Sequence, residues 1–361
     1  MSALRTRERS ALVLIVALTA LTGVANYSRW AAVPRFAIAT VALAGLAWVV
    51  SFATEQLGER FGPGVTGMLQ SSLGNLPELF VVIFALQKGE LVVAQTAIVG
   101  SILANGLLVL GLVIVVGARR SPDGVMRFSK RLPRDTATLL QVTVFIIVLL
   151  GLSLASHDPA SHHVKAISVV GAISLLIVYL AWAVPYLRSD TAPGAATGPD
   201  ANGAESHGPR VSLAVTLVLL LAAGTASAFV SDWFVSALKP AIVQLHVSQA
   251  FAGLVIVAIA GNAVENTAGL VLAWKGHADL AISVVKNSVA QIAAFLFPLL
   301  VLISFALSTT LTFSLAPVYI GALLLTTLAL AQVTGDGEAA AFEGWALVAL
   351  YVILGTLTLY E

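Results

Sequence analysis

The sequence of 361 residues contains no cysteine and very few charged residues. Without cysteine the chain forms neither disulfide bonds nor thiolate metal sites, and redox chemistry at sulfur is excluded as well. Asp, Glu, Lys and Arg make up 10% of the residues, against about 25% in soluble globular proteins. This scarcity of charge, with 58% hydrophobic residues and a mean hydropathy of +0.96, excludes a soluble domain and predicts an integral membrane protein.

The charges that are present nearly balance, with a formal net charge of +1. A protein that binds nucleic acid usually carries a large basic excess, so nucleic acid is not expected as a partner. The lipid bilayer is the expected surrounding of almost the whole chain.

Hydrophobic runs of about 20 residues, the length of a membrane-spanning helix, recur from one end of the chain to the other. The strands of a membrane barrel have only about ten residues, so these spans are expected to be helices. The pattern predicts an all-α integral membrane protein with eleven spans, at about 10–27, 34–57, 64–86, 91–117, 135–155, 164–187, 211–237, 247–274, 279–304, 313–332 and 341–360.

The basic residues predict the orientation of the chain. Arg5, Arg7 and Arg9 precede the first span, and six Lys or Arg residues lie between 119 and 134. Positive charge favours the cytoplasmic side, so a cytoplasmic N-terminus is expected. The low Lys and high Ala contents indicate a bacterial source, and the expected location is therefore the bacterial inner membrane. Alternatively, the first span is a cleaved signal peptide, which would leave the orientation of the other ten spans unchanged.

One long polar stretch interrupts the hydrophobic runs. Residues 188–210 are rich in Ala, Gly, Pro and Asp, a composition typical of a flexible linker, here expected in the cytoplasm. The expected organisation is an N-terminal helix and loop at 1–33, a five-helix repeat at 34–187, the linker at 188–210, and a second five-helix repeat at 211–361.

An internal repeat is the strongest signal in the sequence. The segment LGNLPELFVVIFALQKG at 73–89 has its counterpart in AGNAVENTAGLVLAWKG at 260–276, 187 residues later. Both copies contain the pattern G-N-x-x-E, and at the same separation Ser101 in VGSILANGLLVLG matches Ser288 in KNSVAQIAAFLFP. With eleven spans the two copies cross the membrane in opposite directions, so the repeat is expected to be inverted.

Inverted repeats with interrupted helices near the middle of the bilayer are typical of secondary transporters, in which two similar halves enclose one site. A carboxylate within the bilayer costs about 3 kcal/mol, so Glu78 and Glu265 require a compensating ligand. Gly74 with Pro77, and Gly261, are suited to break the two helices and to expose backbone carbonyls beside each carboxylate.

Neutral oxygen donors accompany the two carboxylates. They are Asn75, Asn262, Ser101, Asn105, Ser288 and Gln291. Hard divalent cations such as calcium bind six to eight oxygen ligands of this kind, and the motifs contain no His or Cys. The sequence therefore predicts a cation and proton site with Glu78 and Glu265 as its metal ligands, and no cofactor besides the transported ion.

Several charged residues have alternative interpretations. Glu78 and Glu265 alternatively pair with basic residues and only stabilise helices. Glu55 and Asp232 near span ends are candidates for a proton relay, or are simply solvated. The segment HDPASHH at 157–163 either binds a metal outside the membrane or is a solvated loop.

The motifs GNLPEL, GSILAN, GNAVEN and NSVAQI resemble the signature regions of the calcium/cation antiporter superfamily, and within it the cation/proton exchanger family. FATEQLGERFG, SDWFVSAL and QAFAGLVIVAIAGN, outside the motifs, are also similar, so the resemblance covers most of residues 50–305. It implies an exchanger of calcium for protons in which Glu78 and Glu265 are the principal ligands and proton carriers. Spans two and seven are expected to form the gating bundle, which slides against the helices that carry the site.

The second half departs from the family pattern. Asn266 stands where the family often has His, Asn287 where it has Gly, and Lys286 replaces an apolar residue. Lys286 either points to a neighbouring helix or a wet vestibule, where only its stem matters, or approaches Glu265 and supplies part of the charge of a divalent cation.

Other functions remain open. The same fold would serve a sodium/calcium exchanger or an antiporter for another cation, and a channel would conduct without proton coupling. An intramembrane metalloprotease would need a motif such as H-E-x-x-H, which this sequence lacks.

Overall fold

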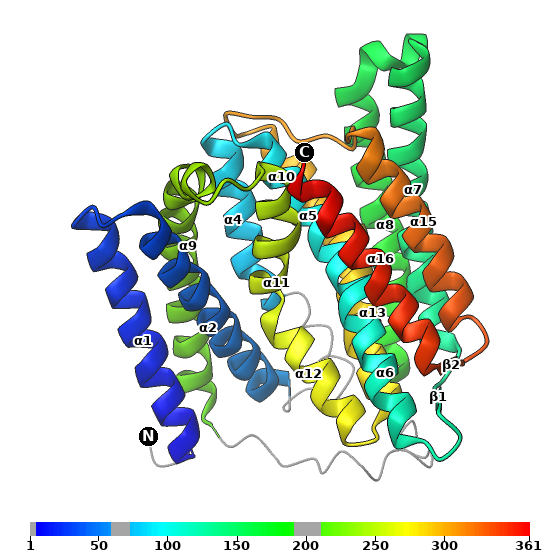
Figure 1. The fold of residues 1–361 in the computed structure, drawn as a ribbon, viewed down its shortest axis with the longest axis horizontal. Helices are drawn as coiled ribbons and strands as arrows, with labels where there is room; N and C mark the ends of the chain where they lie inside the picture. The colour runs from blue at the N-terminus through cyan, green and yellow to red at the C-terminus, as the bar shows by residue number, and fades with distance from the viewer. Residues whose placement is uncertain (1–4, 59–72, 191–210) are drawn as a thin grey trace. The chain divides into compact units, whose positions relative to one another are not determined.

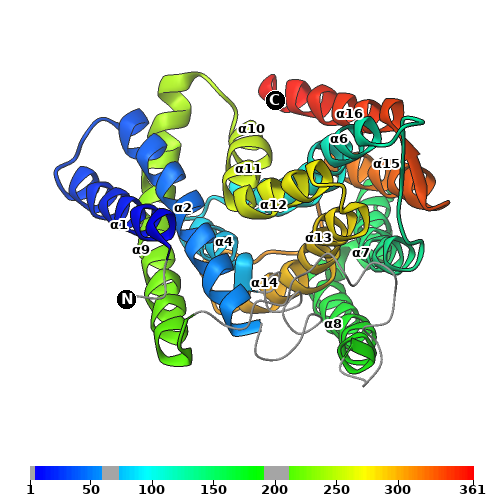
Figure 2. The same ribbon diagram turned by 90° about the horizontal axis from the view of Figure 1, so that it is seen from below.

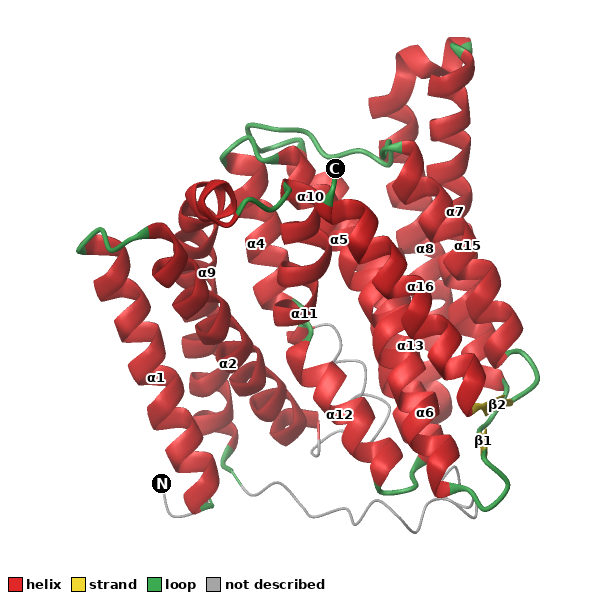
Figure 3. Ribbon diagram, in the orientation of Figure 1, coloured by secondary structure: helices red, strands yellow, loops and turns green. Residues whose placement is uncertain are grey.

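The computed structural model describes residues 5–58, 73–190 and 211–361. Helices make up nearly all of these residues, and the described strands form one small pair (Figure 3). Nine described helices are long and apolar enough to cross a membrane, and a tenth span results if the helix pair 249–261 and 265–274, bent by 60°, is counted as one. The all-helical membrane fold is thus confirmed, while the count of eleven stays a prediction.

The chain packs as two compact units, which are described separately. The first contains residues 1–84, 181–246 and 260–264, and the second contains residues 85–180, 247–259 and 265–361. Each unit includes parts of both sequence repeats, so the repeat boundaries at 34–187 and 211–361 stay sequence predictions. Most of the expected linker at 188–210 and the start of the expected third span lie outside the described residues.

The first unit is built on three long helices. Its elements are α1 (Thr6–Tyr27), α2 (Ala32–Gly58), most of α4 (Leu76–Gln87), the end of α8 (Val164–Asp190) and α9 (Leu213–Leu245). Phe36 of α2 packs against Phe234 of α9 with ring centroids 4.9 Å apart, and Tyr27 meets Trp233 edge-on at 5.8 Å. These contacts join α1 and α2 to α9, so that α2 and α9, the expected spans two and seven, belong to one packed body.

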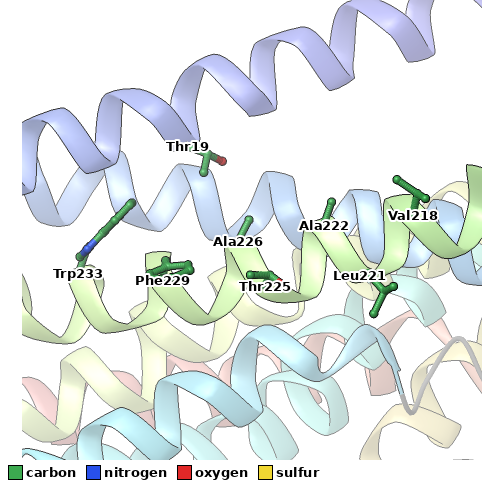
Figure 4. Close-up of a pocket in the computed structure, with 8 residues that line it drawn as sticks. All are labelled: Thr19, Val218, Leu221, Ala222, Thr225, Ala226, Phe229 and Trp233. Carbon is green, nitrogen blue, oxygen red and sulfur yellow. The ribbon is translucent and has the colours of Figure 1, made fainter.

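An apolar groove opens between α1 and α9 (Figure 4). It has a volume of about 590 Å³ and is lined by Thr19, Val218, Leu221, Ala222, Thr225, Ala226, Phe229 and Trp233. None of these side chains carries a charge, so the groove offers nothing that would bind a cation.

The second unit contains the remaining elements (Figure 1). They are α5 (Leu91–Leu103), η1 (Ala104–Val109), α6 (Leu110–Arg120), β1 (Val125–Arg127), α7 (Arg131–Ser156), η2 (Pro159–His163), most of α8, α10 (Gln249–Phe251), η4 (Ala252–Val257), α11 (Ala258–Gly261), α12 (Ala263–Trp274), α13 (Ala278–Gln291), η5 (Ile292–Leu296), α14 (Phe297–Ser304), α15 (Pro317–Thr334), β2 (Glu338–Ala340) and α16 (Ala341–Leu359). Residues 260–264, at the junction of α11 and α12, pack with the first unit.

The continuous span of α5, η1 and α6 is the core of the second unit, and most of its side chains are buried. Where α6 crosses α16, Gly111 and Gly344 touch so closely that a Cβ on either would come within 2.5 Å of the carbonyl oxygen of the other. The crossing therefore requires glycine on both helices, since any side chain would separate their backbones.

Two short strands of this unit lie outside the membrane-spanning helices. β1 and β2 pair antiparallel, with Val125 opposite Ala340 and Arg127 opposite Glu338. Arg127 also binds Asp123 at 2.6 Å, and its guanidinium holds the pKa of that exposed carboxyl below its usual value. These strands are not predictable from the sequence, because three residues are too few to show a periodic pattern.

The sequence repeat is also visible in the secondary structure. Shifted by 187 residues, α4 coincides with α12, α5 coincides with α13 to within one residue, and α6 begins where α14 begins. The turns between the paired helices both contain a glycine with positive φ, Gly89 at 76° and Gly276 at 85°. A left-handed backbone is costly for residues with a Cβ, which explains why both copies have glycine at this position.

Candidate functional site

Both copies of the G-N-x-x-E motif interrupt a helix. The helical pattern stops for one residue at Asn75 and again at Asn262, each directly after the glycine of its motif. The next helices, α4 and α12, then begin, and the Asn75 carbonyl accepts a hydrogen bond of 2.9 Å from Leu79 N. A new helix start presents backbone N–H groups that have no partner within the helix, so each break creates polar backbone inside an apolar span.

The two glutamates lie in the first turn of these new helices. Glu78 and Glu265 are 1% and 7% exposed, so neither carboxylate faces bulk water. The first turn is the favourable end of the helix dipole for a carboxylate, which offsets part of the cost of its burial.

In the first unit, Glu78 lies against the second motif. A Cβ added to Gly261 would be 3.8 Å from the Cβ of Glu78, so these two residues are in van der Waals range. Asn75 and Asn262 are buried here as well. From α9, the Ser231 hydroxyl donates to the Pro77 carbonyl at 3.4 Å, which ties the start of α4 to α9.

In the second unit, the polar residues after each motif approach one another. Asn105 Nδ2 donates to Ser288 Oγ at 3.0 Å, joining η1 to α13. Ser101 and Gln291 are also buried, at 0% and 1% exposure. The structure thus brings the polar residues of both copies into the interior of this unit.

The position of Glu265 follows from the hairpin of α12 and α13. The two helices are joined by the short turn at 275–277, and Gly269 packs against Val285, whose Cγ2 would lie 2.9 Å from an added Cβ. Glu265 precedes Gly269 by one helical turn, and Ser288 follows Val285 by almost one turn. In an antiparallel pair this places Glu265 and Ser288 at about the same height.

Three acceptor oxygens of this region are buried without a donor among the described residues. Among the described residues, no hydrogen bond reaches Glu265 Oε2 or Gln291 Oε1, and the same is true of Oδ1 of the neighbouring Asn287. Buried carboxylate and amide oxygens almost always have a partner. An unsatisfied set of this kind is suited to receive a cation or a proton.

Lys286, which precedes Asn287 in α13, is also buried, with 1% exposure, and has no hydrogen bond or ion pair with another described residue. Helices advance about 100° per residue, so Lys286 points about 200° away from Ser288, to the opposite side of α13. α7 lies beside α13 (Figure 2). Ala293, two turns after Lys286 and therefore on the same side of the span, accepts a hydrogen bond from Thr143 of α7, so Lys286 faces α7.

Two hydrogen bonds fix the register between α7, with the loop before it, and the span of α13 and η5. Ser129 N donates to the Asp279 carboxylate, and Thr143 Oγ1 donates to the Ala293 carbonyl at 3.2 Å. Both bonds join residues 150 positions apart, so the helices run parallel and Lys286 lies level with Thr136, itself 2% exposed.

The other candidates lie outside this arrangement. Glu55 is exposed near the end of α2, and Asp232 is half-buried in α9. The segment 157–163 forms the turn between α7 and α8, where the Asp158 carboxylate accepts a bond of 2.9 Å from Ala160 N. In the part of the chain that the structure describes, no group of three His, Asp or Glu side chains is close enough to hold a metal ion.

Sequence reasoning missed the π-helical segments. η1 begins directly after α5 and η5 directly after α13, at matching places in the two copies, and η4 precedes the break at Asn262. A π-turn contains one residue more than an α-turn, and such segments are frequent at functional sites. Hydrophobic periodicity does not reveal them, because one extra residue in a uniformly apolar span leaves no visible change of pattern.

Comparisons with known proteins show what the chain is similar to. Residues 31–185 and 215–360 match the family described as sodium/calcium exchanger protein. The Ca(2+)/H(+) antiporter ChaA of Bacillus subtilis is 30% identical over 345 residues, covering 95% of this chain and 96% of that protein. The vacuolar calcium ion transporter of Schizosaccharomyces pombe is 30% identical over 335 residues, covering 92% of this chain and 80% of that protein.

The fold is shared with a solved structure. The Ca2+/H+ antiporter protein YfkE is 25% identical, with a TM-score of 0.76, and the match covers 98% of this chain and all of that one.

Proposed function

Because the chain belongs to the sodium/calcium exchanger protein family, we propose that it is a secondary antiporter that exchanges calcium for protons across a membrane. The relatives that cover nearly its whole length are named as calcium/proton antiporters, and none of the features of the site is that of an enzyme. Calcium, or another cation of similar chemistry, and protons are its substrates.

One observation carries the proposal. Each copy of the repeat places a buried glutamate in the first turn of a helix that restarts at an asparagine. A buried carboxylate in a membrane span is expensive unless a cation or a proton neutralises it. Two such carboxylates in matching positions are the minimum that a site exchanging one divalent cation for protons requires.

We assign the ligands from both copies. Glu78 and Glu265 bind the cation or carry the protons, and their supporting oxygens come from Asn75, Asn262, Ser101, Asn105, Ser288 and Gln291. Gly74, Pro77 and Gly261 allow the helix interruptions beside them. Support for Gln291 comes from its buried, unsatisfied Oε1, and support for Ser288 from its bond to Asn105.

Exchange follows from competition for the same oxygens. A carboxylate that binds a metal must be deprotonated, so calcium and protons exclude one another at Glu78 and Glu265. Alternating access then lets each ligand enter on one side of the membrane and leave on the other. The gating bundle is the packed body of α2 and α9, whose aromatic contacts support movement as one piece.

The proposed location is a bacterial inner membrane with the N-terminus in the cytoplasm. The basic residues at 119–134 support this orientation, because they follow α6 and would face the cytoplasm. Glu55 and Asp232 are proposed to relay protons toward the site from α2 and α9.

The test is transport by purified protein in liposomes with a pH indicator inside. Calcium added outside should move inward as protons move outward, and Glu265→Gln should abolish both fluxes. Glu338→Gln is the matched control, since Glu338 is a half-exposed surface residue next to Arg127. Calcium uptake without any proton movement, but dependent on a sodium gradient, would instead identify a sodium/calcium exchanger.

A further inference from the structure

The π-helical segment η4 is held from two sides within the second unit. On one side lies α5, where a Cβ added to Gly100 would be 2.5 Å from both Cα and the carbonyl oxygen of Leu254. On the other side lies α16, where the Tyr351 hydroxyl donates to the same carbonyl at 3.2 Å. Tyr351 is 4% exposed, so water does not compete for this bond.

The start of α10, the helix before η4, is also hydrogen-bonded to the end of α16. Ser248, which caps α10 through Phe251 N at 2.8 Å, donates its hydroxyl to the Thr358 carbonyl near the end of α16. Gly355, one turn beyond Tyr351, lies against Val255. The start of this span is therefore fixed to α16 along about two turns.

The register of η4 decides where the residues after it point. In the structure Ala258 N donates to the Gly253 carbonyl, five residues earlier, which is the π-helical bond. Conversion to an α-helix would replace it with a bond to the Leu254 carbonyl, four residues earlier. The residues that follow, up to the break at Asn262, would then turn by about 100° and shift by about 1.5 Å.

We infer that Tyr351 is a positioning residue, whose hydroxyl engages the Leu254 carbonyl, holds η4 in its π-helical register and thereby sets the direction of Asn262 and Glu265. This inference rests on the proposed function, because it presumes that Asn262 and Glu265 bind the transported cation. Tyr351 itself touches neither cation nor proton in this assignment.

The test compares two tyrosines of the same unit. Tyr351→Phe removes only the hydroxyl and keeps the ring. Tyr319→Phe is the matched control, because Tyr319 is also 4% exposed and its hydroxyl donates to Glu361 at 2.5 Å, away from η4. Tyr351→Phe should raise the calcium concentration for half-maximal exchange about fivefold, the effect of one neutral hydrogen bond, while Tyr319→Phe should leave it unchanged.

A second readout reports the register directly. The chain has no cysteine, so Ile259→Cys, at a position 38% exposed, gives a single site for a spin label between η4 and the break. A turn of about 100° changes the collision rate of this label with oxygen in the bilayer. The rate should change in Tyr351→Phe and remain unchanged in Tyr319→Phe.

Folded Tyr351→Phe protein with unaltered calcium dependence and unaltered label accessibility would overturn the inference. It would also be overturned if exchange slowed while the label at position 259 reported no change, because Tyr351 would then act elsewhere. If the unsubstituted protein exchanged no calcium for protons, the proposed function would fail, whereas the label would still test the hold on η4.

Discussion

Replacing Lys286 with methionine should increase the affinity for calcium. Lys286 is buried in α13 two residues before Ser288, and its side chain leaves the helix on the opposite side. A helix with its side chains is about 10–12 Å across, so the ammonium and a cation at Ser288 are about 13 Å apart. Methionine has similar length and shape but no charge, so Lys286→Met removes the charge and keeps most of the packing.

The repulsion across this distance is substantial. With an effective dielectric constant of about 20, one unit charge and a divalent cation about 13 Å apart repel one another by about 2.5 kcal/mol. This energy corresponds to a change of about 70-fold in the dissociation constant. Relaxation of nearby dipoles will reduce the effect, and we expect a gain in calcium affinity of at least about tenfold.

The assay is calcium-driven proton efflux from liposomes, measured over a range of calcium concentrations at fixed pH. Lys165→Met is the control, because Lys165 is exposed on α8 and its charge is screened by solvent. Lys286→Met should also unfold at a higher temperature, since a buried charge without an ion pair among the described residues is destabilising. The reasoning is refuted if folded Lys286→Met has the calcium dependence of the Lys165→Met control.

Three further predictions follow from the fold and the proposed site. Glu78→Gln should abolish calcium-driven proton movement as completely as Glu265→Gln, although both proteins remain inserted; normal proton coupling in either variant would contradict the shared site. In intact cells an impermeant reagent should label a single cysteine at Ser161, whereas one at Ser121 should be labelled only after the cells are opened; labelling of both in intact cells would contradict the topology. Gly344→Val should lower the free energy of unfolding by about 1–3 kcal/mol or more, and with it the thermal unfolding temperature, because the valine side chain meets the backbone of α6. An unchanged unfolding temperature would show that α6 and α16 can move apart without loss of stability.

Much of the fold could be predicted from the sequence, because a membrane span has a simple signature. Hydrophobic runs of sufficient length predicted nearly every long helix, and α13 with α14 ends at Ser304, the last residue of the expected span at 279–304. Less could be predicted where polar residues extend a helix. α9 continues to Leu245, beyond the expected end at 237, and includes Pro240 within its last turns.

The candidate site was predicted as a set of residues, and the structure adds how they are placed. The motif spacing pointed to Glu78 and Glu265, and the structure shows both buried at matching helix starts. The direction of Lys286 could not be read from the motif alone, since its approach to Glu265 or to a neighbouring helix depends on which face of α13 meets α7. Ser129 and Thr143 provide that register, and neither belongs to a recognisable pattern.

The matching π-helical segments also constrain how the two copies have changed relative to one another. A π-turn contains one residue more than an α-turn, so a copy that gains one without a compensating loss becomes longer by one residue. The separation of 187 residues holds before η1 and η5, at Ser101 and Ser288, and also after them, at the starts of α6 and α14. An insertion in one copy alone would have changed this separation by one, so a residue added to either copy must have been matched by one in the other.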